Sequence, residues 1–338
     1  MKNIIRLLLV LCIIVIATLF GCKDDKIEII PADPIDTLPG SWLRMDDIPI
    51  GVTELPLVAK GSKIYAAGGM VDEIASNNFM CYDRISDTWE LLPDMPKDLD
   101  HHSTAIVEDT LYVIGGGGIN GLHTEKNVYG YCFTTRVWSI KAALPITISA
   151  GAAVAYENKI YLFGGTSVFG VNGERYYFPN VLRYDPQLNI WDTVAAYPNT
   201  REHITCLLIE DLIYIIGGRT YDYDNGFETS DLVESFSPQT GQWNTVTNMP
   251  IFSSGVSASN IGNKIYFIGG EDLGKITVVD LHHEYDLETG VWKSIKRIPK
   301  NRHGVNAVTI NDEVHILGGG PIVALGIATK SHYVLTID

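Results

Sequence analysis

The stretch WELLPDMPKDLDHHSTAIVEDTLYVIGG, residues 89–116, decides the fold, because its frame occurs six times in the chain. It begins with a tryptophan, has a proline seven residues later, and reaches a Gly-Gly pair 26 residues after the tryptophan. The tryptophans of the six copies are Trp42, Trp89, Trp138, Trp191, Trp243 and Trp292. The glycine pairs are Gly68-Gly69, Gly115-Gly116, Gly164-Gly165, Gly217-Gly218, Gly269-Gly270 and Gly318-Gly319. The chain is therefore one unit repeated six times.

Each glycine pair follows five residues that predict a short strand, because they are mostly apolar, β-branched or aromatic and glycine ends the run. These segments are residues 63–67, 110–114, 159–163, 212–216, 264–268 and 313–317. An aromatic residue stands seven positions before five of the tryptophans, namely Tyr82, Tyr131, Tyr184, Phe236 and Tyr285. A proline follows all six by seven positions, and proline is typical of a turn out of a strand.

This pattern resembles the kelch repeat, whose period of about 50 residues corresponds to four strands in one blade of a β-propeller. The tryptophans here are 47, 49, 53, 52 and 49 residues apart. The resemblance implies an all-β fold over residues 40–338, a six-bladed kelch β-propeller with four antiparallel strands per blade.

The order of the motifs also predicts how the ring closes. Trp42 has no glycine pair before it, and Gly318-Gly319 has no tryptophan after it. Residues 303–309, 313–319 and 331–337 supply three strands of the sixth blade, so the N-terminal segment 41–45 must supply the fourth. We expect the glycine pairs to adopt positive φ and to admit a close neighbour, and the tryptophans to lie in the core between blades.

The N-terminus predicts export. Lys2 and Arg6 precede an apolar run, Leu7 to Phe20, which is short for a membrane span and typical of a signal peptide. The ending Leu19-Phe20-Gly21-Cys22 resembles a bacterial lipobox, although Phe20 departs from the small residue usual there. Residues 1–21 are then a signal peptide, Cys22 is acylated, and residues 22–39 form an acidic, proline-containing tether. Lys23-Asp24-Asp25 looks like the surface-export signal of Bacteroidetes lipoproteins, which implies a lipid anchor in the cell envelope, at the outer membrane.

Charge and cysteine content exclude several classes of function. Without residues 1–21 the chain loses two cations and carries 23 basic against 40 acidic residues, a net charge of −17. Such a surface repels phosphate backbones, so we expect no nucleic-acid partner. Cys81, Cys132 and Cys206 form an odd set without CxxC spacing, and we interpret them as small apolar residues. We expect no cofactor.

All variation in repeat length falls between a glycine pair and the next tryptophan, so differences between blades accumulate on one face of a propeller. Two loops there stand out, residues 166–180 and 219–230. The candidate ligand-binding residues in them are Arg175, Tyr176, Tyr177, Arg219, Tyr221 and Tyr223. Aromatic rings beside charged groups can stack on sugars or hold a peptide. The alternative is that the tyrosines pack each loop onto its own blade.

A second group of candidates lies sixteen to fourteen residues before the glycine pairs. Arg201 and Arg302 occupy a column in which kelch domains often place a ligand-binding arginine, while the other blades have Val52, Leu99, Ile148 and Ser253. His101, His203, His303 and Glu54 stand close by in sequence and could act as acid/base groups or metal ligands. Because His101 and His203 belong to blades two steps apart, we expect them to be too far apart to bind one ion, and we predict no metal site.

Two functions fit these observations. The first is a membrane-anchored, exported binding module whose ligand is a glycan, protein or peptide. The alternative is an enzyme, since the chain also resembles bacterial six-bladed kelch proteins that mutarotate or epimerise sialic acid. That family carries a long acidic and aromatic insertion in one blade, and no insertion of that size occurs here. The sequence therefore favours binding over catalysis and identifies no catalytic residue.

Overall fold

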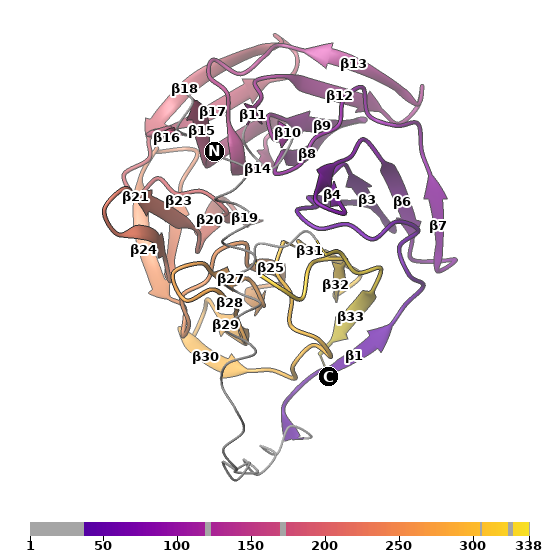
Figure 1. Cartoon of the computed structure of the whole chain (residues 1–338), viewed down its shortest axis with the longest axis vertical. Coiled ribbons are helices and arrows are strands. Elements are labelled where there is room, and N and C mark those ends of the chain that lie inside the picture. Colours follow the sequence, from indigo (N-terminus) through magenta and orange to yellow (C-terminus); the bar gives the residue numbers. More distant parts are fainter. Residues whose placement is uncertain (1–36, 119–122, 170–173, 305, 324–326, 338) are drawn as a thin grey trace, which may run out of the picture. The chain divides into compact units, whose positions relative to one another are not determined.

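A ring of six four-stranded antiparallel sheets forms the fold, as the repeats predict (Figure 1). The structure, a computed structural model, describes residues 37–118, 123–169, 174–304, 306–323 and 327–337. The predicted signal peptide, Cys22 and almost all of the predicted tether lie outside these residues. Within the described residues, no helix is long and apolar enough to cross a membrane.

Each blade runs from an innermost to an outermost strand in chain order, and the sixth blade is completed by β1. Blade 1 consists of β2 (Leu57–Lys60), β3 (Lys63–Ala67), β6 (Phe79–Asp83) and β7 (Thr88–Leu91). Blade 2 consists of β8 (Ser103–Val107), β9 (Thr110–Ile114), β12 (Val128–Cys132) and β13 (Val137–Lys141). Blade 3 consists of β14 (Ser149–Tyr156), β15 (Lys159–Phe169), β17 (Asn180–Asp185) and β18 (Ile190–Ala196).

The second half of the ring repeats this plan. Blade 4 consists of β19 (Thr205–Ile209), β20 (Leu212–Ile216), β23 (Leu232–Phe236) and β24 (Trp243–Asn248). Blade 5 consists of β25 (Ser257–Ile261), β26 (Lys264–Ile268), β29 (His282–Asp286) and β30 (Val291–Ser294). Blade 6 consists of β31 (Ala307–Ile310), β32 (Glu313–Leu317), β33 (His332–Thr336) and β1 (Ser41–Arg44). The pairing of β1 with β33, in which Trp42 lies opposite Leu335, confirms the predicted closure.

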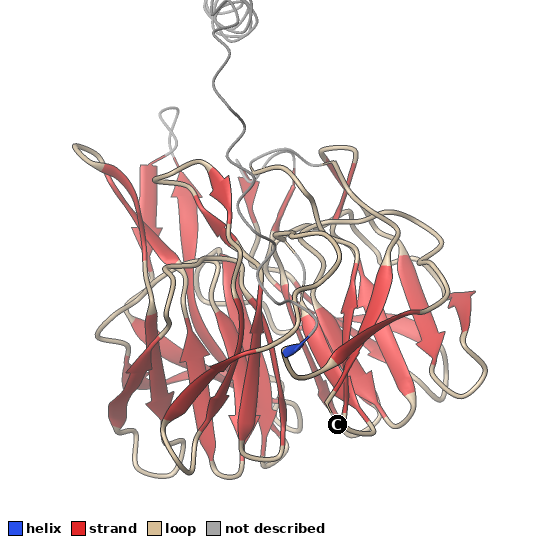
Figure 2. Cartoon of the chain, turned by 90° about the horizontal axis from the view of Figure 1, so that it is seen from below, coloured by secondary structure: helices blue, strands red, loops and turns tan. Residues whose placement is uncertain are grey.

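Small hairpins extend five of the blades at one end of the ring, and Figure 2 shows them projecting beyond the main sheets. They are β4 (Met70–Val71) with β5 (Ile74–Ala75), β10 (Gly117–Gly118) with β11 (His123–Thr124), the end of β15 with β16 (Glu174–Tyr177), β21 (Arg219–Asp222) with β22 (Gly226–Thr229), and β27 (Glu271–Asp272) with β28 (Thr277–Val278). We call this end the loop face.

Six apolar clusters fill the spaces between neighbouring blades. The cluster between blades 6 and 1, for example, joins Leu317 and Ile310 to Ile64 and Met80. Burial of these side chains is the main stabilising contribution to a ring whose blades share no covalent link except the chain itself. Cys81 is buried in this way, whereas Cys132 and Cys206 are half-buried; all three thiols are free.

The tryptophans lie between blades, as predicted, but none is fully buried. Each sits on an outermost strand, which has solvent on one side, and five of them lie directly opposite the aromatic residue seven positions earlier, as Trp191 lies opposite Tyr184. The indole Nε1 reaches back to the preceding blade: Trp191 donates to the Ala142 carbonyl at 2.9 Å and Trp138 to the Pro93 carbonyl at 2.9 Å. Each tryptophan packs against one inter-blade cluster from the rim of the ring, so the predicted position between blades is confirmed, but each is half-buried and not fully buried.

Candidate functional site

Short loops lead into the innermost strand of every blade on the loop face, and we call them the inner loops. They are residues 52–54, 99–101, 201–203, 253–255 and 302–304, and in blade 3 the equivalent residues 148–150, which include the first two residues of β14. The three residues of each inner loop lie in distinct environments. In chain order we call their positions the buried, the middle and the axial position. These positions determine which candidate residues can meet a ligand.

The glycine pairs hold the inner loops in place. The amide of each second glycine donates to the carbonyl at the buried position of the next blade, at 2.8–3.1 Å, as Gly165 does to Arg201. A Cβ on the first glycine of a pair would lie only 2.3–2.6 Å from that same carbonyl. All twelve glycines have positive φ. The predicted role of the pairs, left-handed backbone that admits a close neighbour, is confirmed.

The buried position explains why Arg201 and Arg302 do not face the loop surface. Arg201 is 4% exposed and Arg302 is 2% exposed. Arg201 donates to the Gly217 carbonyl at 2.7 Å and to Glu234 at 3.0 Å, and Arg302 donates to the Gly318 carbonyl at 2.8 Å. Each arginine thus binds the glycine turn of its own blade, which departs from the ligand-binding role expected from sequence. The other residues of this column are buried too: Val52, Leu99, Ile148 and Ser253. These residue types already indicated from sequence that the position is buried.

The axial position places side chains around the ring axis. It is occupied by Glu54, His101, Ala150, His203, Gly255 and Gly304, all with φ between +49° and +60°. Backbone hydrogen bonds join successive members, from the Ala150 amide to the His101 carbonyl and from the His203 amide to the Ala150 carbonyl, both at 2.7 Å. Three small residues in this column leave space on the axis that the three larger side chains fill.

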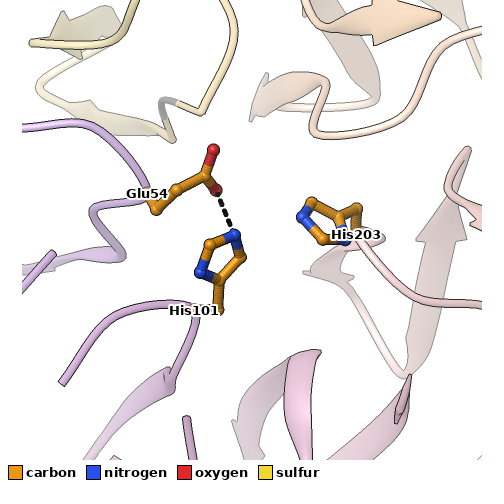
Figure 3. A group of neighbouring side chains, drawn as sticks. All are labelled: Glu54, His101 and His203. Carbon is orange, nitrogen blue, oxygen red and sulfur yellow. Dashed lines mark ion pairs between the residues drawn. The ribbon is translucent and has the colours of Figure 1, made fainter. Parts of the chain in front are cut away.

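Glu54, His101 and His203 therefore converge, and we call them the axial cluster (Figure 3). The Oε2 atom of Glu54 lies 3.4 Å from Nε2 of His101, and the imidazole centroids of His101 and His203 are 5.0 Å apart. One potential ligand atom from each residue lies within 4.8 Å of the other two. The expectation that His101 and His203 are too far apart to share an ion was wrong, because blades two steps apart approach closely at the inner radius.

The two histidines have opposite electrostatic environments. Burial alone would lower the pKa of His101, but Glu54 and Asp100 outweigh it and raise the pKa to about 9. Asp100 is fully buried and lies 2.8 Å from Nδ1 of His101. Burial and the nearby Arg219 guanidinium hold the pKa of His203 well below its usual range. At neutral pH a charged imidazole thus faces a neutral one.

A buried ionic network surrounds the cluster. Arg219 donates to Nε2 of His203 at 2.9 Å, to Glu202 at 3.2 Å and to Ser254 at 3.1 Å, and it also binds Glu271. Glu202 accepts a further bond from Arg175 at 2.7 Å. The structure therefore brings the predicted residues Arg175 and Arg219 to the axial cluster.

His303, another predicted residue, occupies a middle position at the edge of this network. Its Nδ1 lies 3.0 Å from the Gly320 carbonyl, and its Nε2 lies 3.7 Å from Glu271. Four residues around the axial cluster were not predicted from sequence: Asp100, Glu202, Ser254 and Glu271. Their place in the repeat could have revealed them. Each middle position pairs with the residue directly after the glycine pair of its own blade, as Glu202 does with Arg219.

The two long loops are hairpins that contact each other. The amide of Arg175 donates to the Tyr223 hydroxyl at 2.9 Å, and the Arg175 guanidinium lies over the rings of Phe227 and Tyr221. Tyr221 and Tyr177 are partly buried, so the packing alternative holds for them. Tyr176 and Tyr223 remain 42% and 63% exposed.

A small cavity lies beside the axial cluster, towards the innermost strands. Its volume is about 60 Å³, and His102, Thr205 and Asn306 line it together with the cluster. A second cavity of about 90 Å³ shares His102, Thr205 and Asn306 with it and continues along the innermost strands. Spaces of this size hold a few water molecules or an ion. A ligand larger than this cannot be enclosed in either cavity.

The chain matches two family models of kelch repeats. The KLHDC2/KLHL20/DRC7 Kelch-repeats domain matches residues 101–319, and the Kelch motif matches residues 55–96. The chain is 29% identical over 256 residues to Kelch-like protein terF of Aspergillus terreus, covering 69% of this chain and 54% of that protein. It is 27% identical over 204 residues to Kelch-like protein 35 of Mus musculus, covering 60% of this chain and 32% of that protein. The chain thus spans about half of the first relative and a third of the second.

A solved structure, "Structure of YjhT", resembles the fold with a TM-score of 0.72 at 16% sequence identity. The match covers 85% of this chain and 95% of that one. At this identity the likeness supports the architecture alone.

Proposed function

Because the chain belongs to the kelch-repeat family, we propose that it is a ligand-binding propeller of the cell envelope that takes a glycan on its loop face. Kelch propellers typically serve as binding modules. The observation that carries the proposal is the link made by Arg175, which binds Glu202 of the ionic network and whose amide donates to the hydroxyl of the exposed Tyr223.

The chemistry of this surface suits a sugar. Carboxylate, imidazole and guanidinium groups bind hydroxyls and sugar acids through directional, charge-assisted hydrogen bonds. Exposed tyrosine rings supply flat apolar surface for the C–H face of a pyranose, with a hydroxyl at the edge. Arg175 connects the two parts, because it binds Glu202 of the network and contacts Tyr223 of the neighbouring hairpin.

A protein partner is the second candidate, and a different observation favours it. Large apolar side chains are exposed on loops of the loop face in several blades, including Ile74 at 68%, Phe252 at 47% and Ile276 at 77%. Exposed apolar groups around a polar centre can dock on a protein surface. Kelch propellers typically bind protein partners.

A glycan array probed with the purified protein tests the proposal. We expect binding to a limited set of glycans, and N-acetylneuraminic acid should be included among the monosaccharides. A blank array together with capture of a defined protein would favour the second candidate. If a bound sugar also exchanged its anomers faster in the presence of the protein, a sugar mutarotase would replace the binding module.

The envelope location rests on the N-terminal sequence. The short apolar run from Leu7 to Phe20 followed by Gly21-Cys22 motivates lipid attachment at Cys22. Metabolic labelling with a fatty-acid probe should mark the wild-type protein and not Cys22→Ser. Equal labelling of the two proteins, or a mature N-terminus elsewhere, would contradict the anchor.

A further inference from the structure

We infer that the axial cluster is a binding site for one divalent transition-metal ion, of the class of Zn²⁺, with Glu54, His101 and His203 as its protein ligands. Two histidines and one carboxylate are a donor set that such ions take in proteins, with a further position open to water or a ligand. The axial cluster is also part of the proposed glycan surface, but metal binding can be tested apart from glycan binding because the metal alone is the ligand.

The distances are close to those that an ion requires. Donor atoms 2.0–2.2 Å from one tetrahedral ion lie about 3.3–3.6 Å from each other. Glu54 Oε2 and His101 Nε2 already stand 3.4 Å apart, and the three potential ligand atoms lie within 4.8 Å of one another. Closing the remaining gap requires a side-chain movement of about an ångström at His203.

His101 is oriented as metal-binding histidines usually are. In such sites one imidazole nitrogen binds the ion while the other binds a carboxylate or carbonyl, which fixes the ring. Here Nδ1 of His101 lies 2.8 Å from the buried carboxylate of Asp100, and Nε2 faces Glu54. Asp100 is therefore the positioning residue of the proposed site.

The backbone gives an independent argument. Gly255 and Gly304 show that glycine satisfies the axial position, and Ala150 shows that a small side chain does. Glu54, His101 and His203 adopt the same left-handed φ, which costs about 1–2 kcal/mol for a residue with a side chain. The chain thus places its two imidazoles and one carboxylate where glycine would be more stable.

The charge around the cluster also favours a cation. The carboxylates of Glu54, Asp100, Glu202 and Glu271 surround it, with the guanidiniums of Arg219 and Arg175 as the nearby permanent cations. Arg219 donates to Nε2 of His203, so an ion taking that nitrogen replaces this bond. When the ion takes this nitrogen, Arg219 still has Glu202, Glu271 and Ser254 as acceptors.

The test is titration of the full-length protein with Zn²⁺ by calorimetry, and with Co²⁺ as a spectroscopic probe. We expect one ion per chain and the visible absorption of Co²⁺ bound to nitrogen and oxygen in a four-coordinate site. His203→Gly should lower the Zn²⁺ affinity more than about 100-fold, since it removes a ligand, and Asp100→Asn should lower it about 10- to 100-fold. Glycine at position 203 matches the residue of two other blades, so this variant is expected to fold.

His283→Gln is the matched control, because His283 lies on β29, outside the inner loops. It should bind Zn²⁺ as the wild type does, and Zn²⁺ should raise the melting temperature of both but not of His203→Gly. Equal Zn²⁺ affinity in wild type and His203→Gly would overturn the inference. So would the lack of one-to-one binding to the wild type.

Discussion

The imidazole rings of His101 and His203 lie edge to face with centroids 5.0 Å apart, although a whole blade separates the strands that follow them. The inner loops make this approach possible. They place one residue of every blade at the axis, and three of the six are glycine or alanine. The residues of the candidate site are thus concentrated where the blades are closest, and the glycine pairs hold the inner loops there.

Ring closure by β1 predicts a defect on truncation. A chain that starts at residue 47 lacks Ser41–Arg44 and leaves β33 as an unpaired edge. We expect this chain to melt at a lower temperature and to self-associate, as measured by calorimetry and light scattering. A monomer that melts like the full chain would show that β1 contributes nothing to closure.

The glycine turns predict a position-specific loss of stability. Gly164 and Gly262 have φ of +57° and +56°, but a Cβ at Gly164 would lie 2.3 Å from the Arg201 carbonyl, whereas Gly262 has open space. Gly262→Ala should cost about 1–2 kcal/mol from left-handed strain alone. Gly164→Ala should cost about 1–3 kcal/mol more, because the inner loop must move. Urea denaturation measures the free energy of unfolding of both variants. Equal losses would contradict the role of the glycine pair in holding the inner loop.

The rim position of the tryptophans predicts a moderate effect. Trp191→Phe removes the hydrogen bond to Ala142 while keeping an aromatic ring against Tyr184. We expect a loss of about 0.5–1.5 kcal/mol in the free energy of unfolding. A loss above about 3 kcal/mol, typical of removing a buried core aromatic, would place the indole in the core after all.

Buried histidines in blade 6 predict acid sensitivity. Nδ1 of His315 lies 2.9 Å from Nε2 of His332. Burial lowers the pKa of His315 to about 4 and the pKa of His332 to about 3. The unfolded chain takes up protons near pH 6.5, before the folded one does, so stability is full above pH 6.5 and declines as the pH falls towards 4 and below.

The measurement is the free energy of unfolding between pH 7 and 4. The double variant His315→Gln, His332→Gln should lose less stability over this range than the wild type loses. Parallel curves for the two proteins would assign the acid sensitivity to other groups.

The fold could be predicted from sequence because each of its determinants is local and repeated. The spacing from Tyr184 to Trp191 already encodes the cross-strand pair, and the Gly-Gly pair at the end of each second strand encodes a left-handed turn. The column of Glu54, His101 and His203 was also visible. The convergence of these three side chains could not be predicted, because the sequence gives the order of the blades around the ring and not their separation at the axis.

The two arginines show the opposite limit. Arg201 and Arg302 have the charge of ligand-binding residues, but their backbone carbonyls receive the glycine amides of the preceding blade. That contact places them beneath a turn, where the side chain can reach only its own blade. Charge type alone could not reveal this. The apolar residues of the same column could.

The most direct test of the central claim measures where a glycan binds. The strongest ligand from the array is titrated by calorimetry into the wild type, into the double variant Tyr176→Ala, Tyr223→Ala, and into Leu188→Ala. Leu188 is 66% exposed on the turn between β17 and β18, away from the loop face, and serves as the control. We predict a 10- to 100-fold weaker affinity for the double variant, about 1.4–2.8 kcal/mol, and wild-type affinity for Leu188→Ala. Unchanged affinity in the double variant, or a loss only in Leu188→Ala, would contradict a glycan site on the loop face.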